Sequence, residues 1–263
     1  MRKVLVLISD KNYLEHAKSL FFAAKDIGKW EGDLCLIANN VDDDSLLKDF
    51  RNFGVEIVHK KINNYYYANY FIFDVYMKKW DYLIYMDCDF TIFGDLNTIV
   101  EEDVMKNPLL SVDIEPFSIH QYFCQGWDEN IKKESLKELF NEYDLNKKGF
   151  NAGFMGFNTS LIKENTLGEL LTLSDRLQPI NNHTSPKGSD QPIFNLYFIN
   201  DLNYIKNKKV CFWKESTIDT VAQHHCRWEA PWCNSNYSSK LGRTYLENYK
   251  NNLNKFYVST NKL

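Results

Sequence analysis

The first ninety residues alternate between short apolar runs and stretches with helical spacing, and this alternation restricts the folds open to the chain. Uninterrupted apolar runs are typical of strands that are buried on both faces of a parallel sheet. The runs predicted to form strands are residues 4–8, 34–37, 55–58 and 82–86. Four strands joined by helices predict an α/β fold with an open, mostly parallel sheet and right-handed crossovers.

The connecting stretches carry the signals of helices. After residue 13, apolar residues recur every three or four positions, which predicts a helix before the second strand. Asp43 and Asp44 are suited to cap a second helix, and Gly54 is suited to end it. A third helix is predicted over residues 67–79, despite its many aromatic side chains.

Beyond residue 100 the periodicity is weaker, but further elements are predicted. The strands are residues 109–112 and 154–157, the helices are residues 131–142, 160–177 and 191–199, and the residues from 248 onward form a helix or a loose tail. No repeat and no linker rich in Gly, Ser or Pro interrupts the chain. We therefore expect a single domain.

Charge and cysteine content exclude several partners and compartments. With 31 Lys and Arg against 35 Asp and Glu, the net charge of −4 offers no footprint for nucleic acid or an anionic membrane. The six Cys include no C-x-x-C pair, which is typical of reduced thiols inside cells. The apolar run at residues 4–8 is too short for a signal peptide or a transmembrane segment, so we expect a cytoplasmic protein.

An acidic pair follows the fourth predicted strand. Asp87 and Asp89 stand directly after residues 82–86, and open α/β sheets bind their ligands beyond the carboxyl ends of the strands. Two carboxylates held there offer the oxygen ligands that a hard divalent cation prefers, and such a cation bridges the phosphates of a nucleoside diphosphate. A solvated acidic turn explains the same two residues, so both interpretations stay open at this point.

Three later segments accompany the acidic pair. They are Phe-Asn-Ala-Gly at residues 150–153, Ser-Asp-Gln-Pro at residues 189–192 and a loop rich in His, Cys and Trp at residues 224–232. With the acidic pair, and in this order, the set resembles the retaining glycosyltransferases of family 8, the glycogenin and lipopolysaccharide galactosyltransferase group. The resemblance covers most of residues 3–232. It implies the GT-A fold of nucleotide-diphospho-sugar transferases, in which helices flank a Rossmann-like, mostly parallel central sheet.

In that family the acidic pair and a late His bind a Mn²⁺ ion that holds the diphosphate of a UDP-sugar. The resemblance implies that Asp87, Asp89 and His224 are these ligands. The loop of that family reads H-x-x-G-x-x-K-P-W. When its Pro-Trp pair is aligned with residues 231–232, its His falls on His224 rather than His225. This donor set suits Mn²⁺ better than Mg²⁺, for which imidazole is a poor ligand, and Mg²⁺ stays as the alternative.

The resemblance also implies contacts to the sugar donor. The assigned roles are nucleotide binding for Asp10, Tyr13, Asp87 and Cys88, sugar binding for Asp113, Asn151 and Gly153, and catalysis near the anomeric carbon for Asp190 and Gln191. A carboxylate or amide oxygen beside that carbon stabilises an oxocarbenium-like charge. Plainer explanations stay open, since Asp10 and Asp190 are also suited to cap helices and Gly153 to allow close approach of the backbone.

The sequence departs from the family pattern at positions that concern the donor. Arg227 stands where the family has Gly, and Ala230 stands where it has a Lys that contacts the leaving phosphate. Tyr70 and Phe71 occupy a region that usually holds a basic residue. The diphosphate of the donor therefore lacks one positively charged side chain that the family normally supplies. The side chains that remain to supply this charge are Arg227, Lys214 and Arg243.

These features predict a metal-dependent glycosyltransferase that moves a hexose from a nucleotide-diphosphate sugar, a UDP-sugar, to a sugar or glycoconjugate acceptor with retention. The resemblance places a nucleotide-binding half at residues 1–113, an acceptor and catalytic half at residues 114–247 and a tail at residues 248–263. No nucleic-acid partner and no transmembrane segment are expected.

Three alternatives remain. A sugar nucleotidyltransferase shares the sheet and the acidic site, although residues 7–13 lack the Gly-rich loop of that class. A catalytically silent carbohydrate-binding protein is favoured only by the missing Lys at position 230. A zinc site is the third, although its spacing matches no standard finger, and its ligands would be His224, His225, Cys226 and Cys233.

Overall fold

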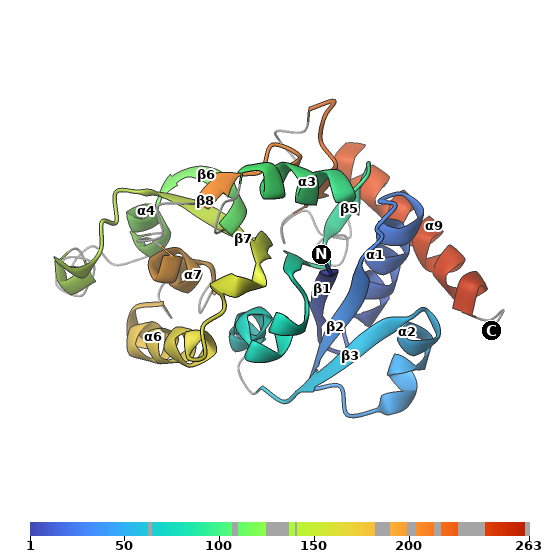
Figure 1. The fold of residues 1–263 in the computed structure, drawn as a ribbon, viewed down its shortest axis with the longest axis horizontal. Helices are drawn as coiled ribbons and strands as arrows, with labels where there is room; N and C mark the ends of the chain where they lie inside the picture. Colours follow the sequence, from blue (N-terminus) through green and yellow to red (C-terminus); the bar gives the residue numbers. More distant parts are fainter. Residues whose placement is uncertain are drawn as a thin grey trace.

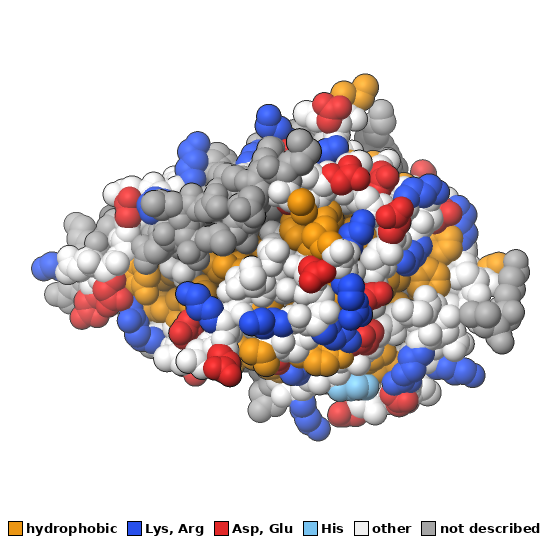
Figure 2. Space-filling model, viewed as in Figure 1, with side chains coloured by type: hydrophobic (Ala, Val, Ile, Leu, Met, Phe, Trp, Pro, Cys, Tyr) orange, Lys and Arg blue, Asp and Glu red, His pale blue; other side chains and the backbone are white. Residues whose placement is uncertain are grey.

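The computed structural model describes residues 1–62, 65–106, 110–124, 137–139, 141–181, 190–198, 204–212, 217–225 and 240–260. In these ranges helices flank a central sheet, as Figure 1 shows. No helix within them is both long and apolar enough to cross a membrane. On the face drawn in Figure 2, basic and acidic side chains are interspersed, so neither charge dominates that face.

A seven-stranded sheet has the strand order β3-β2-β1-β4-β7-β6-β8. Its strands are β1 (Lys3–Ser9), β2 (Asp33–Asn39), β3 (Val55–Lys60), β4 (Tyr82–Met86), β6 (Leu110–Ser118), β7 (Lys148–Asn158) and β8 (Tyr204–Lys206). The first four pair in parallel, whereas β7 runs antiparallel to β4 and to β6. Because β8 pairs in parallel with β6, four of the six pairings are parallel and the predicted α/β architecture is confirmed.

A second, three-stranded sheet begins directly after the acidic pair. It consists of β5 (Phe90–Ile92), β10 (Ala222–His224) and β9 (Val210–Phe212), with β10 in the middle. The pairing of β10 with β5 is antiparallel and sets His224 opposite Phe90. This small sheet therefore brings a late part of the chain against the carboxyl end of β4.

Helices cover both faces of the large sheet. They are α1 (Leu14–Asp26), α2 (Lys48–Asn52), α3 (Asn97–Lys106), α4 (Ile119–Cys124), α6 (Thr166–Asn181), α7 (Gln191–Phe198) and α9 (Lys240–Thr260), with a short 3₁₀ helix η1 (Asp44–Leu47) before α2. The predicted cap of that region is confirmed, because the Asp43 carboxylate accepts from the Ser45 amide at 3.0 Å. The C-terminal segment is a helix rather than a loose tail, and Figure 1 shows α9 lying along α1.

The buried side chains form two layers, one on each face of the large sheet. Successive strand residues point to opposite faces, so Val4, Val6 and Ile8 of β1 enter one layer while Leu5 and Leu7 enter the other. The first layer also contains buried residues of the 3₁₀ segment before β4 and of α6 and α7, and the second contains those of α1, α2 and α9. Burial on both faces explains why the strands read as continuous apolar runs.

The predicted helix over residues 67–79 is wrong, because this segment forms two 3₁₀ helices, η2 (Tyr65–Phe73) and η3 (Val75–Lys79). Asp74 separates them in an extended conformation, and its carboxylate accepts from the Tyr76 amide at 2.9 Å. Tyr70, Ile72 and Phe73 are fully buried against the sheet. Packing of these bulky side chains and the cap at Asp74 therefore override a continuous α-helix.

Other predicted boundaries move as well. The strand predicted at residues 154–157 is the end of the longer β7, and the helix predicted from residue 160 begins only at Thr166. Before it, the Asn158 side chain caps a 3₁₀ turn, η4 (Thr159–Leu161), by accepting from the Ser160 amide at 2.9 Å. Most of the helix predicted at 131–142 lies outside the described residues. The part of it that the structure describes, residues 137–139 and 141–142, is helical.

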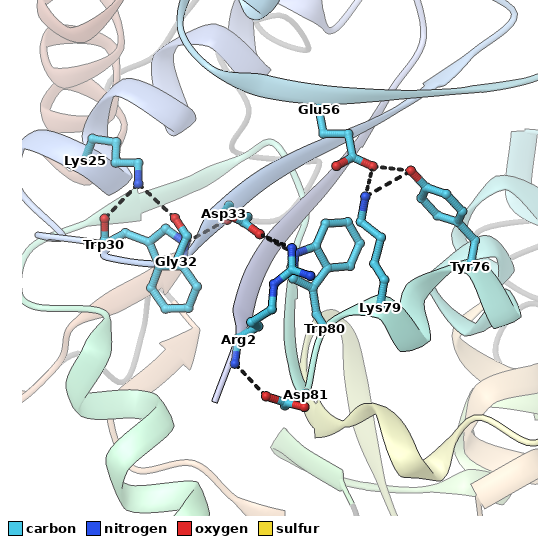
Figure 3. Close-up of polar contacts among 10 residues, drawn as sticks. All are labelled: Arg2, Lys25, Trp30, Gly32, Asp33, Glu56, Tyr76, Lys79, Trp80 and Asp81. Carbon is cyan, nitrogen blue, oxygen red and sulfur yellow. Dashed lines mark hydrogen bonds and ion pairs between the residues drawn. The ribbon is translucent and has the colours of Figure 1, made fainter.

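Polar contacts tie together the amino ends of the central strands (Figure 3). The indole of Trp80, just before β4, donates to Asp33 Oδ2 at the start of β2 at 2.6 Å. The same carboxylate lies 3.3 Å from the Arg2 guanidinium, just before β1, and the Arg2 amide donates to Asp81 at 2.6 Å. With this edge fixed, the carboxyl ends of β1, β2 and β4 are held in register at the opposite edge, where the acidic pair lies.

Candidate active site

The acidic pair occupies the turn between β4 and β5. The Asp87 amide donates to the Gly153 carbonyl of β7 at 2.8 Å, which continues the pairing of β4 with β7 by one residue. The hydroxyl of Tyr85, two residues earlier on β4, donates to Asp87 Oδ1. The His225 amide donates to the Asp89 carbonyl at 3.2 Å. Backbone contacts from two sheets therefore fix the turn.

Asp87, Asp89 and His224 converge on one point. The His224 Nε2 atom lies 3.0 Å from Asp89 Oδ1 and 3.6 Å from Asp87 Oδ2, and one potential ligand atom from each residue falls within 4.8 Å of the others. The His224 ring stacks on Phe90 with the centroids 4.8 Å apart and the planes 5° from parallel. The ring orientation of His224 is thus set by a residue of the paired strand β5.

Two observations show that this group of residues fits a divalent cation. Asp89 Oδ1 is buried and has no well-aligned hydrogen-bond partner among the described residues, although His224 is close to it. Gly153 faces the group, and a Cβ atom there would lie 2.9 Å from Asp87 Oδ2 and 2.5 Å from His224 Cε1. Two carboxylates and an imidazole are a donor set suited to Mn²⁺.

Asp87, Asp89 and His224 interact electrostatically. Burial, followed by repulsion from Asp89, raises the pKa of Asp87. Burial also acts to raise the pKa of Asp89, but the attraction of His224 outweighs it, and the net pKa is lowered. Two carboxylates this close favour a positive charge between them.

The two adjacent histidines have different environments. His225 directly follows the last residue of β10, and its Nε2 atom lies 2.7 Å from Thr91 Oγ1 of β5 rather than against the carboxylates. Burial lowers the pKa of His225 to about 4, so the ring is neutral at pH 7. Of the four residues of the alternative zinc site, Cys226 and Cys233 lie outside the described residues, and His224 and His225 contact different partners.

Asp190 and Gln191 lie beside this group, at the start of α7. Asn151 of β7 links them to it, because its Nδ2 donates to Gln191 Oε1 at 3.2 Å and its Oδ1 accepts from the Gly153 amide at 2.9 Å. The Asp190 carbonyl accepts from the first turn of α7, so this residue caps the helix through its backbone. Its carboxylate Oδ2 accepts from Asn69 Nδ2 at 2.6 Å.

The Asp190 carboxylate is electrostatically unusual. Burial raises its pKa to about 7, repulsion from Asp87 adds to the rise, and the hydrogen bond from Asn69 opposes it. A carboxylate with a raised pKa that interacts with a potential metal ligand is typical of a functional site. Its interaction with Asp87 also indicates that the catalytic and metal-binding candidates share one site.

The residues assigned to the nucleotide lie at the neighbouring end of β1. Asp10 follows β1 and accepts from the Asn12 amide at 2.8 Å, and the Tyr13 amide donates to the Asp10 carbonyl at 3.2 Å. Cys88 is buried, and its thiol donates to the Ile8 carbonyl at 3.4 Å, so only its backbone faces outward. These residues and the acidic pair therefore share one edge of the sheet.

Asp113, which was assigned to the sugar, pairs through its backbone with Asn151, and its side chain lies outside the described residues. Arg227, Ala230 and Lys214 fall outside them too, as does the Arg243 side chain. Tyr70 is buried, with its hydroxyl 3.1 Å from Ser174 Oγ, and Lys60 Nζ lies 4.6 Å from the Phe71 ring.

Sequence reasoning missed three members of the site. Tyr85 and Phe90 flank the acidic pair. Residues two positions apart in extended chain lie on the same side, so the sequence could have predicted the contact of Tyr85 with Asp87. Asn69 lies 121 positions from its partner Asp190, so no local sequence pattern predicts their contact.

Comparison with known proteins agrees with this geometry. The profile of glycosyl transferase family 8 matches residues 34–220. The protein named Probable glycosyl transferase Gly, from Streptococcus gordonii, is 25% identical over 167 residues, which are 63% of this chain and 19% of that protein. The chain thus spans about a fifth of the length of this relative.

The fold matches solved glycosyltransferases. An active-site glutamine-to-glutamate mutant of LgtC superposes with a TM-score of 0.65 at 13% identity, covering 94% of this chain and 95% of that one. The galactosyltransferase LgtC in complex with donor and acceptor sugar analogs gives 0.61 at 14% identity, with the same coverage. Apo GlyE from Streptococcus pneumoniae gives 0.64 at 16% identity, covering 98% and 64%. The GT-A fold predicted from the resemblance is therefore confirmed, and the chain belongs to glycosyl transferase family 8.

Proposed function

We propose that this family member is a metal-dependent glycosyltransferase that moves a hexose from a UDP-sugar to a sugar or glycoconjugate acceptor with retention. The observation that carries the proposal is the convergence of Asp87, Asp89 and His224 beside Asp190 and Gln191. A site that combines ligands for a divalent cation with a carboxylate of raised pKa suits transfer from a diphosphate donor. LgtC, a structural neighbour, was crystallised with donor and acceptor sugar analogs.

Asp87, Asp89 and His224 would hold the cation, for which we propose Mn²⁺. When bound, the cation supplies Lewis-acid stabilisation of the diphosphate as it departs. The unsatisfied Asp89 Oδ1 and the space left by Gly153 support this assignment. Because the phenol of Tyr85 donates to Asp87 Oδ1, the other oxygen, Oδ2, is the one turned toward His224.

Asp190 and Gln191 would face the anomeric carbon. Asn151 orients the Gln191 carboxamide and Asn69 orients the Asp190 carboxylate, so both oxygens are positioned before the reaction begins. A preorganised negative charge stabilises the positive charge that develops on the sugar ring during transfer. An active-site mutant of the structural neighbour LgtC replaces a glutamine, which supports a role for Gln191.

The remaining assignments follow from position. Asp10, Tyr13 and the backbone of Cys88 would bind the nucleotide at the end of β1, and Asp113 and Asn151 would bind sugar hydroxyls on the β6–β7 side. We therefore propose a nucleotide-binding half at residues 1–113 and an acceptor and catalytic half at residues 114–247, in a single domain.

A thermal-shift panel of nucleotide sugars with and without Mn²⁺ tests this function. A ligand at a hundred times its Kd adds about 2.7 kcal/mol of stability, which corresponds to a rise in Tm of roughly 5 °C for a chain of this size. We expect this rise for a UDP-hexose only when Mn²⁺ is present, and no rise in an Asp89→Ala variant. Equal shifts with Mn²⁺ and with a chelator would show that donor binding does not use the cation site.

A further inference from the structure

The C-terminal helix α9 is firmly attached to the nucleotide-binding half. Phe256 is fully buried, and its ring lies 4.7 Å from Phe53 and 6.0 Å from Phe50. The Tyr257 hydroxyl donates to Glu15 of α1 at 2.7 Å and accepts from Lys18 at 2.9 Å. These contacts anchor the C-terminal half of α9 (Figure 1) and leave its N-terminal half pointing toward the small sheet.

That N-terminal half carries two tyrosines, one turn apart, that contact His16 of α1 and His225, which is next to the candidate ligand His224. Tyr245 and Tyr249 lie on the same face of α9, with their rings nearly parallel at 8°. The Tyr249 ring stacks on His16 of α1 at 4.6 Å, and the Tyr245 hydroxyl lies 3.3 Å from His16 Nδ1. Tyr245 is only 4% exposed, so its ring is held within the protein.

Tyr245 contacts His225, the residue that directly follows the candidate metal ligand at the end of β10. Its ring centroid lies 4.7 Å from that of His225, and His225 Nε2 lies 2.7 Å from Thr91 Oγ1 of β5. His225 and Thr91 are 3% and 6% exposed, so this contact is closed to solvent. On the opposite side of the same two strands, His224 stacks on Phe90. Two side-chain contacts thus join β5 to the end of β10, one made by His224 and one by His225.

We propose that Tyr245 is a positioning residue for the cation site, acting through His225 and Thr91 to hold His224 in place. The inference rests on the proposed metal-dependent function. The strand β10 has only three residues and His224 is the last of them, so the ligand lies where the backbone pairing ends. Metal ligands depend on the groups behind them, and loss of such groups typically costs 10–100-fold in metal affinity.

The test is direct Mn²⁺ binding to the folded protein without donor, followed by the electron paramagnetic resonance signal of free Mn²⁺. We expect Tyr245→Ala to weaken Mn²⁺ binding by about tenfold or more. Tyr245→Phe keeps the ring against His225 and should restore affinity to within about threefold of wild type. If Tyr245 served only the overall stability of the protein, the two variants would bind Mn²⁺ with the same affinity at a temperature where both are folded.

Tyr257→Ala is the matched control. It makes the same change in the same helix, about 18 Å further along at about 1.5 Å per residue, and removes the contacts to Glu15 and Lys18. We expect a lower Tm with unchanged Mn²⁺ affinity. An equal loss of affinity in Tyr257→Ala and Tyr245→Ala would overturn the positioning role, because general loosening of α9 would then explain both.

Thr91→Val is a second, nearly isosteric variant that decides the case if Tyr245→Ala does not fold. It removes the partner of His225 and should weaken Mn²⁺ binding severalfold, whereas unchanged affinity would overturn the proposal. Wild-type protein that binds no Mn²⁺ would contradict the proposed function and, with it, this role. Wild-type binding together with wild-type affinity in Tyr245→Ala would overturn the positioning role alone.

Discussion

Gly153→Ala is expected to abolish Mn²⁺-dependent binding and turnover of the donor while leaving the protein folded. The added Cβ would lie 2.5 Å from His224 Cε1 and 2.9 Å from both Asp87 Oδ2 and Asn151 Oδ1, so side chains of the cation site must move apart. The Gly153 carbonyl accepts from the Asp87 amide at 2.8 Å where β7 meets β4, which limits how far its backbone can retreat. Overpacking of this kind costs about 1–3 kcal/mol, and a misplacement of about 1 Å costs about a hundredfold in rate.

Gly94→Ala is the matched control for this prediction. A Cβ at Gly94, which follows β5, would make an ordinary contact of 3.5 Å with Val221 Cγ2. We expect this variant to bind Mn²⁺ and donor as the wild type does. The measurements are calorimetric Mn²⁺ titration, donor turnover and circular dichroism. Wild-type Mn²⁺ affinity in Gly153→Ala would show that the cation does not sit against this glycine.

Asp190→Asn is expected to lower turnover by about a hundredfold or more with little change in donor affinity. The variant keeps an oxygen that accepts from Asn69 but loses the charge that we assign to the developing cation on the sugar. Asp175→Asn is the control. Asp175 accepts a hydrogen bond from Tyr67, which lies in the same 3₁₀ helix η2 as Asn69, but Asp175 is outside the proposed site. Unchanged turnover in Asp190→Asn would refute the catalytic role.

The same substitution should stabilise the metal-free protein at high pH. The pKa of Asp190 is about 7 in the folded protein and about 4 in the unfolded chain, so the folded state holds this proton more tightly. The group therefore stabilises the fold most at low pH, and this contribution is lost between about pH 4 and pH 7. Relative to wild type, Asp190→Asn should gain on the order of 1–3 kcal/mol between pH 5 and pH 8, and denaturant unfolding at both pH values measures this.

The two tests on Asp190 separate function from structure. A charge kept at a cost to stability is expected where the charge is used in catalysis. If Asp190→Asn loses the same stability at pH 5 and pH 8, the carboxylate is a structural cap rather than a strained functional group.

The first four strands of the large sheet, β1 to β4, were predictable because their physical signal is local, whereas β8 was not predicted. A run such as residues 4–8 is apolar because both of its faces are covered, and that requirement is written in consecutive residues. The same reasoning failed at residues 67–79, where the Asp74 cap and buried rings selected 3₁₀ turns. Helical spacing alone does not contain that information.

The candidate site was predictable only in part. The spacing of the late loop selected His224 over His225, and the structure turns His224 alone of the two toward the carboxylates. The contacts of Asn69 with Asp190 and of Tyr245 with His225 join segments far apart in the chain. Such contacts are set by tertiary packing, so no pattern within a single element announces them.

The most direct test of the central claim is release of UDP from a panel of UDP-hexoses by the wild type and by Asp89→Ala. Glycosyltransferases with a water-accessible donor site hydrolyse their donor slowly when no acceptor is present, so the acceptor need not be known. We expect Mn²⁺-dependent UDP release for at least one sugar by the wild type, and a loss of at least a hundredfold in Asp89→Ala. Release that proceeds equally in a chelator, or equally in Asp89→Ala, would contradict a cation site formed by Asp87, Asp89 and His224.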